Sequence, residues 1–87
     1  MYLEELTEMI EQKIAQNSSK VVFSYYELRL KRNLSQSDLD KVLELITIYL
    51  ENKNYKVYKT GDTYLYQNQL LEVQTNELLV AIKEDLS

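Results

Sequence analysis

Four residue types are missing from this sequence: it has no cysteine, no histidine, no proline and no tryptophan, and its single glycine is Gly61. Without cysteine, neither a disulfide framework nor thiol chemistry is possible, which fits a reducing compartment. Without histidine, no Ser-His or Cys-His nucleophile pair can form, and a zinc ion would be held by carboxylates alone. One glycine cannot build a glycine-rich loop that cradles phosphates. We therefore expect a protein that is not an enzyme and uses neither a cofactor nor a metal ion.

Long apolar runs are absent as well. No stretch approaches the roughly 18–20 apolar residues that are needed to cross a bilayer. The first five residues include two glutamates and no basic side chain, whereas a secretory signal would begin with a basic region. These features predict a cytoplasmic protein with no membrane partner. A length of 87 residues corresponds to one domain, spanning residues 1–87.

Charge is distributed unevenly along the chain. The net charge is −4, which by itself disfavours nucleic-acid binding. Residues 1–16 carry four acidic side chains against one lysine, and residues 72–87 carry the same ratio. Residues 20–32 carry four basic side chains against one glutamate, and residues 53–62 carry three lysines against one aspartate. The two ends are therefore acidic and two interior segments are basic.

The first helix is predicted from about Tyr2 to Gln16. Apolar residues at helical spacing form one stripe along it, namely Leu3, Leu6, Ile10 and Ile14. The polar residues 17–19 should end this helix. The β-branched and aromatic residues 21–23 then predict a short strand.

Two serine caps predict the next two helices. Ser24 and Glu27 fit a capping box, in which the hydroxyl accepts from the amide three residues on and the carboxylate reaches back. This short helix should end near Asn33. Ser35 should cap a long third helix that ends near Asn52. Its apolar stripe consists of Leu39, Val42, Leu43, Ile46, Tyr49 and Leu50.

The last third of the chain contains two tyrosine-rich segments, 55–59 and 63–67. They flank a turn at 60–62 that holds the only glycine, which predicts a β-hairpin. Residues 68–73 are compatible with either strand or helix. A last helix is predicted by Leu78, Leu79, Ile82 and Leu86. The order is therefore helix, strand, helix, helix, strand, strand, helix, which is an α+β fold.

This order resembles a winged helix-turn-helix domain over nearly the whole chain. Residues 23–28 (Phe-Ser-Tyr-Tyr-Glu-Leu) look like the opening of that family's second helix, and residues 33–35 (Asn-Leu-Ser) look like the turn before its recognition helix. Residues 50–55 resemble the passage into the wing, with Asn54 where glycine is usual, and the hairpin through Gly61 corresponds to the wing. The resemblance implies a small DNA-binding regulator of transcription, with the third helix in the major groove and the wing on the backbone or minor groove.

The basic segments supply residues for such a surface on double-stranded DNA. Arg29 and Arg32 lie three residues apart and therefore share one helical face. Side chains of the third helix would reach base edges, and those of the wing would reach phosphates. The predicted DNA-binding residues are Arg29, Arg32, Gln36, Ser37, Lys41, Lys56, Lys59 and Thr60. The alternative is that these charges are only solvated.

Acidic residues on the third helix favour a different class of function. Asp38, Asp40 and Glu44 lie where a DNA-reading helix usually carries neutral or basic residues. The alternative prediction is a protein–protein interaction module, an adaptor or inhibitor, without DNA binding. Against it, the acids could serve only as a helix cap and as solubilising charges.

Apolar and aromatic residues leave further alternatives open. Leu45 and Ile48 lie off the main stripe of the third helix, so they either pack against the first helix or form an exposed strip for a partner. The resemblance implies a homodimer through the first and last helices, which could equally cover the core of a monomer. Four tyrosines of the hairpin region suit cross-strand packing better than base stacking, namely Tyr55, Tyr58, Tyr64 and Tyr66.

Overall fold

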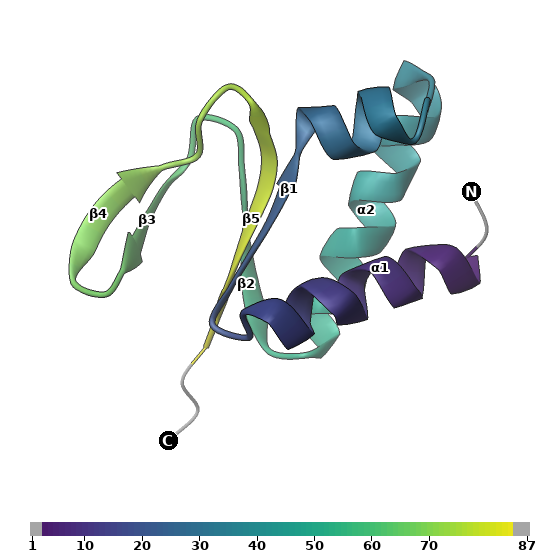
Figure 1. Cartoon of the computed structure of the whole chain (residues 1–87). Coiled ribbons are helices and arrows are strands. Elements are labelled where there is room, and N and C mark those ends of the chain that lie inside the picture. Colours follow the sequence, from purple (N-terminus) through teal and green to yellow (C-terminus); the bar gives the residue numbers. More distant parts are fainter. Residues whose placement is uncertain (1–2, 85–87) are drawn as a thin grey trace.

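The computed structural model describes residues 3–84. In this part of the chain three helical segments and five strands form a mixed α+β fold with two antiparallel sheets. The helices lie on one side of the three-stranded sheet, and a two-stranded hairpin extends away from them on the other side (Figure 1). The elements are α1 (Leu3–Gln16), β1 (Lys20–Ser24), η1 (Tyr26–Lys31), α2 (Gln36–Asn52), β2 (Tyr55–Lys59), β3 (Thr63–Tyr66), β4 (Gln69–Glu72) and β5 (Glu77–Lys83).

Both predicted serine caps are present. The Ser24 amide donates to Glu27 Oε1 at 2.9 Å, and the Glu27 amide donates to Ser24 Oγ at 3.2 Å. This capping box opens η1, which is a single π-helical turn rather than the predicted helix reaching Asn33. Ser35 Oγ accepts from the Asp38 amide at 3.3 Å and starts α2. Local hydrogen bonds therefore set where the helical segments begin.

The predicted last helix is wrong, because residues 77–83 form strand β5. This strand lies between β1 and β2 in the sheet order β1-β5-β2, and Val80 faces Val22 on one side and Tyr58 on the other. A short apolar run fits a strand that is covered on both faces as well as it fits a buried helix, so periodicity alone could not separate them. Leu86, which was part of the prediction, lies outside the described residues.

The predicted hairpin between residues 55–59 and 63–67 is also wrong. β2 pairs with β5, whereas β3 pairs with β4 through a turn at Gln67 and Asn68, whose φ angles are 51° and 64°. Positive φ at both central residues gives the twist of a two-residue hairpin turn. Gly61 does adopt a positive φ, 92°, but it redirects the chain from β2 into β3.

The two faces of β5 contribute to two separate apolar clusters. Leu79 and Ala81 belong to the main cluster with the helices, which includes Phe23, Ile10, Leu28, Ile46 and Leu50. Val80 packs on the opposite face with Tyr64 and Val73 under the hairpin. Successive side chains of a strand point to opposite faces, so a strand that is covered on both faces needs an unbroken apolar sequence.

The fold therefore differs from the four-helix order of a winged helix-turn-helix domain. The finding that overturns that order is the central strand β5 in place of the last helix, together with the separate β3–β4 sheet. Between residues 3 and 84, no helix is long and apolar enough to cross a membrane.

Candidate functional site

Helix α1 borders a different hollow on each of its two sides. One is a groove of about 190 Å³ between α1 and α2, which we call the apolar groove. Its lining residues are Leu3, Leu6, Thr7, Ile10, Leu45, Ile48, Tyr49 and Asn52. The other is a cleft of about 260 Å³ between α1 and η1, which we call the polar cleft.

The apolar groove has a buried floor and an exposed rim. Its floor is formed by Leu6 and Ile10, which are 3% and 1% exposed and belong to the main cluster. Its rim is formed by Leu3, Leu45 and Ile48, which are 67%, 45% and 50% exposed. Leu45 and Ile48 thus line the groove beside α1 without being covered by it.

A hydrogen-bonded trio ties α1 to α2 at one end of this groove. The Tyr49 hydroxyl donates to Glu11 Oε1, and the Lys53 ammonium lies 2.5 Å from the same oxygen. The hydrogen bonds from Lys53 and Tyr49 lower the pKa of Glu11, and the carboxylate in turn raises the pKa values of both partners. Because these groups lie at the surface, solvent screens the interaction.

Acidic side chains surround the apolar rim. Glu4 and Glu8 line an adjoining hollow that shares Leu3 and Thr7 with the groove. On α2, Glu44 and Glu51 stand four and three residues from Ile48 and therefore flank it on the helix surface. All four glutamates are exposed. The rim is thus strongly acidic, with Lys41, one turn before Leu45, as a basic neighbour on α2.

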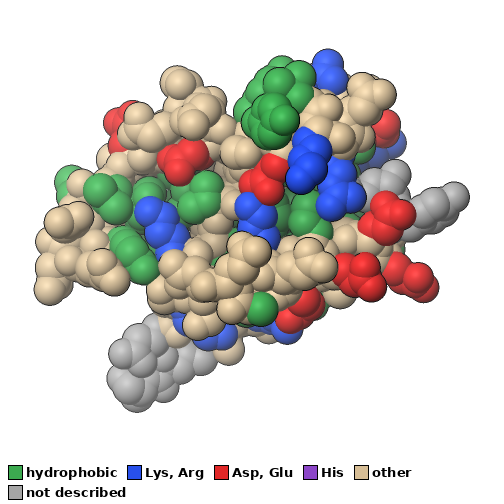
Figure 2. Space-filling model, in the orientation of Figure 1, with side chains coloured by type: hydrophobic (Ala, Val, Ile, Leu, Met, Phe, Trp, Pro, Cys, Tyr) green, Lys and Arg blue, Asp and Glu red, His purple; other side chains and the backbone are tan. Residues whose placement is uncertain are grey.

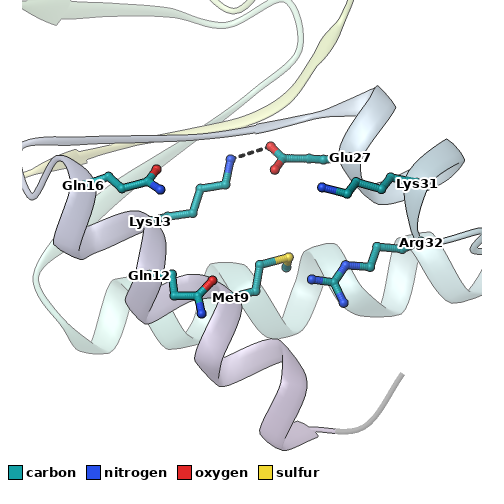
Figure 3. Close-up of a pocket in the computed structure, with 7 residues that line it drawn as sticks. All are labelled: Met9, Gln12, Lys13, Gln16, Glu27, Lys31 and Arg32. Atoms are coloured by element: carbon teal, nitrogen blue, oxygen red, sulfur yellow. Dashed lines mark hydrogen bonds and ion pairs between the residues drawn. The ribbon is translucent and has the colours of Figure 1, made fainter.

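The polar cleft on the other flank of α1 is lined mainly by long polar side chains. Met9, Gln12, Lys13 and Gln16 come from α1, and Glu27, Lys31 and Arg32 come from η1 and its end (Figure 3). In the space-filling view the basic side chains gather between α1 and η1, and acidic side chains lie along the first half of α1 (Figure 2). The two flanks of α1 therefore differ in polarity and in charge.

An internal ion pair fixes one wall of the polar cleft. Lys13 Nζ lies 2.5 Å from Glu27 Oε1 and also donates to the Val22 carbonyl at 2.8 Å. The Glu27 carboxylate also accepts from the Ser24 amide, as part of the capping box. Lys13 and Glu27 are 24% and 25% exposed, so both charges are partly shielded and satisfy each other. Lys31 and Arg32, in contrast, are exposed and form no ion pair within residues 3–84.

Five of the eight predicted DNA-binding residues form side-chain contacts within the protein. The Arg29 guanidinium donates to the Leu34 carbonyl and supports the turn before α2. The Thr60 hydroxyl donates to the Glu77 carbonyl at 2.5 Å. Two further residues contact their own neighbours: the Gln36 amide donates to Asp40, and the Lys56 ammonium lies over the Tyr58 ring.

Ser37 Oγ lies 3.4 Å from Ser35 Oγ. Seven of the eight predicted residues are exposed, and Arg29 is half-buried. Among residues 3–84, no side-chain hydrogen bond joins any two of the eight predicted residues. Only Arg32 lines one of the two hollows of α1. The other cleft residues were not predicted as a site, although the spacing of Gln12 and Gln16 at i and i+4 is typical of a polar helix face.

The segment predicted as the last helix and the tyrosines of the hairpin region both lie within the sheets. A dimer through the last helix has no structural basis, because that segment is β5 in the middle of the sheet. Tyr55 and Tyr64 are buried at 3% and 4% exposure, and Tyr58 packs near Tyr64 with ring centroids 5.5 Å apart. Tyr66 packs against the cluster under the hairpin. The tyrosines of this region are therefore structural.

Comparisons with protein-family models, with curated proteins and with solved structures gave no match. Within the described part of the chain, no group of three acidic side chains is arranged to hold a metal ion.

Proposed function

We propose that this protein is a protein-interaction module whose apolar groove binds a basic amphipathic helix of a partner. The observation that carries the proposal is the exposed rim of Leu3, Leu45 and Ile48 surrounded by glutamates. A groove between two helices is a common place for an amphipathic helix, which inserts apolar residues at positions i, i+3, i+4 and i+7.

The charges around the groove favour one kind of helix. Glu4, Glu8, Glu44 and Glu51 would face lysine or arginine residues beside the apolar stripe of the partner, which orients the helix and speeds association. An acidic helix would meet like charge at the same positions. The groove itself is small, about 190 Å³, so it fits one or two aliphatic side chains and the rest of the contact lies on the rim.

A titration of isotope-labelled protein with a designed peptide tests this proposal. The peptide carries leucine at i, i+3, i+4 and i+7 and lysine at the flanking positions, and its partner peptide has every lysine replaced by glutamate. We expect NMR shifts concentrated at Leu3, Thr7, Leu45 and Ile48 with the basic peptide only. Ile48→Asp should abolish the binding, because it places a charge in the groove.

The matched control is Leu30→Asp. Leu30 is 59% exposed on η1, away from the groove, so its replacement should leave the titration unchanged. Equal binding of the acidic peptide, or shifts spread outside the groove, would refute the proposal. Loss of binding in both variants would mean that exposed apolar surface in general, rather than this groove, attracts the peptide.

Binding to duplex DNA is our second proposal, supported by the exposure of Arg32, Lys41 and Lys59. It competes with exposed acids on α2, because Asp38, Asp40 and Glu44 share the surface of that helix. Fluorescence anisotropy with a mixed-sequence duplex at two salt concentrations tests it, since phosphate contacts release counterions and make affinity fall steeply with salt. Replacing the three cations by alanine should weaken binding to every sequence, and an unaffected affinity would exclude this surface.

A further inference from the structure

We propose that the polar cleft between α1 and η1 binds a phosphate monoester, either free or carried on a side chain. The proposal does not depend on the apolar groove, because the two hollows share no lining residue. It depends on the charges, the donors and the size of the cleft.

The cleft contains two cations that no carboxylate neutralises within residues 3–84. Glu27 is already paired with Lys13 at 2.5 Å and held by the Ser24 amide at 2.9 Å. Lys31 and Arg32 extend from η1 and its end toward α1, and neither makes an ion pair there (Figure 3). Counting Lys13, Glu27, Lys31 and Arg32, the lining has three positive charges and one negative charge, which leaves an excess of two. A phosphate monoester dianion at neutral pH has a matching charge.

The opposite wall offers neutral donors. Gln12 and Gln16 lie four residues apart on α1, so their carboxamides line the same side of the cleft. An Arg32 guanidinium can bind two phosphate oxygens at once, whereas the Lys31 ammonium acts as a point charge. A glutamine carboxamide can donate to a remaining oxygen. The cleft therefore combines a guanidinium, an ammonium and carboxamide groups, and each of these can donate hydrogen bonds to a tetrahedral oxyanion.

Size limits the ligand to something small. The cleft measures about 260 Å³, below the roughly 300–1,000 Å³ of pockets that enclose drug-sized ligands. One phosphate group with a short attached chain fits this volume better than a nucleotide. The segment that presents the two cations is a π-helical turn, a rare geometry that occurs often at functional sites.

An NMR titration of the full-length labelled protein tests the site with two probes at constant ionic strength. One probe is inorganic phosphate, and the other is a short neutral peptide containing one phosphoserine. We expect saturable shifts at the Gln12 and Gln16 side-chain amides and at residues 31–32. The double variant Lys31→Ala with Arg32→Ala should weaken binding by about tenfold or more, because two charge-assisted contacts are lost.

The matched control is Lys41→Ala, which removes an exposed cation from α2 and should leave both titrations unchanged. Saturation by the phosphopeptide at lower concentration than by phosphate would identify a side-chain phosphate as the source, and the reverse order would identify the free anion. Shifts that fail to saturate, or that chloride reproduces, would overturn the proposal. Tighter binding of a DNA duplex that is lost in the same double variant would also overturn it, by assigning the cleft to a phosphodiester backbone.

Discussion

The two flanks of α1 differ in kind, because one borders the apolar groove and the other borders the polar cleft. Toward α2 the helix offers Leu3, Thr7 and Ile10 to an apolar groove with a glutamate rim. Toward η1 it offers Gln12 and Gln16 to a polar cleft with two cations, Lys31 and Arg32, that form no ion pair within residues 3–84. In a helix of 14 residues, side chains three and four positions apart share a face, so both surfaces fit on the same element.

The difference shows why the net charge of −4 is a poor guide to binding in this protein. Glutamates predominate on the α2 side of α1 despite Lys41 and Lys53, and cations predominate on the η1 side despite Glu27, so the two flanks present net charges of opposite sign. Long-range fields would partly cancel, whereas contacts within about one Debye length of 8 Å at physiological salt would not. Four experiments test whether the two flanks of α1 differ in this way.

The largest effect should come from the floor of the apolar groove. Ile10→Ala should lower the free energy of unfolding by about 3 kcal/mol, because the residue is almost fully buried and its removal leaves a cavity. Leu3→Ala on the rim should change it by less than about 0.5 kcal/mol. Urea denaturation with an unchanged m value measures both. Equal losses would mean that the rim is part of the core and is not free for a partner.

The second experiment reverses charge on the groove flank alone. Glu8→Lys together with Glu44→Lys should weaken binding of the basic amphipathic peptide by about tenfold at low salt, and less at high salt. Both residues are exposed, so folding should be unaffected. Fluorescence anisotropy of the labelled peptide measures the change. A salt-independent loss would point to altered packing instead of charge.

The third experiment opens the ion pair in the polar cleft. Lys13→Ala removes the partner of Glu27 and the hydrogen bond to the Val22 carbonyl, which should cost about 1 kcal/mol of stability. The unpaired carboxylate should also repel phosphate and weaken its binding in the NMR titration. Peptide binding at the apolar groove should remain as in the unmodified protein. A change at the groove would show that the two flanks are coupled through α1.

The smallest effect concerns pH and the trio that closes the groove. Lys53 and Tyr49 lower the folded-state pKa of Glu11. The ionised Glu11 carboxylate therefore adds to the free energy of unfolding at pH values above its unfolded-state pKa. That contribution is lost as the pH falls through the lowered folded value. Glu11→Gln should therefore slightly reduce the melting temperature at neutral pH and lessen its fall under acid. Melting curves between pH 7 and pH 3 measure this, and parallel curves for the two proteins would contradict it.

The features that the sequence predicted correctly depend on neighbouring residues. Ser24 with Glu27, and Ser35 with the amide of Asp38, form hydrogen bonds across three positions. A pattern of this range can be read directly from the sequence, because no distant element must be placed first. The turn at residues 60–62 was likewise predicted from its glycine, and Gly61 has a positive φ of 92°.

The errors arose where distant segments decide the structure. The run from Leu78 to Ile82 became a strand because β1 and β2 pair with it from both sides. For the site, Leu45 and Ile48 were marked as off the main stripe, but their neighbour Leu3 follows only from how α1 crosses α2. Of Lys31 and Arg32, only Arg32 was predicted as a binding residue. The neutralisation of Lys13 by Glu27 could not be predicted, because that pair spans 14 positions.

Because β5 is the central strand of its sheet, the sheet cannot be completed until β5 has been synthesised. β1 and β2 have no hydrogen-bonded neighbour in their sheet except β5, which is made after both. At a synthesis rate of about 5–20 residues per second, the segment of β1 waits on the order of several seconds for its pairing strand. During that interval Val21 and Phe23, which end up 1% and 0% exposed, lack the part of their apolar cluster that Leu79 and Ala81 supply. The nascent protein therefore has a window in which chaperones and proteases can compete with folding.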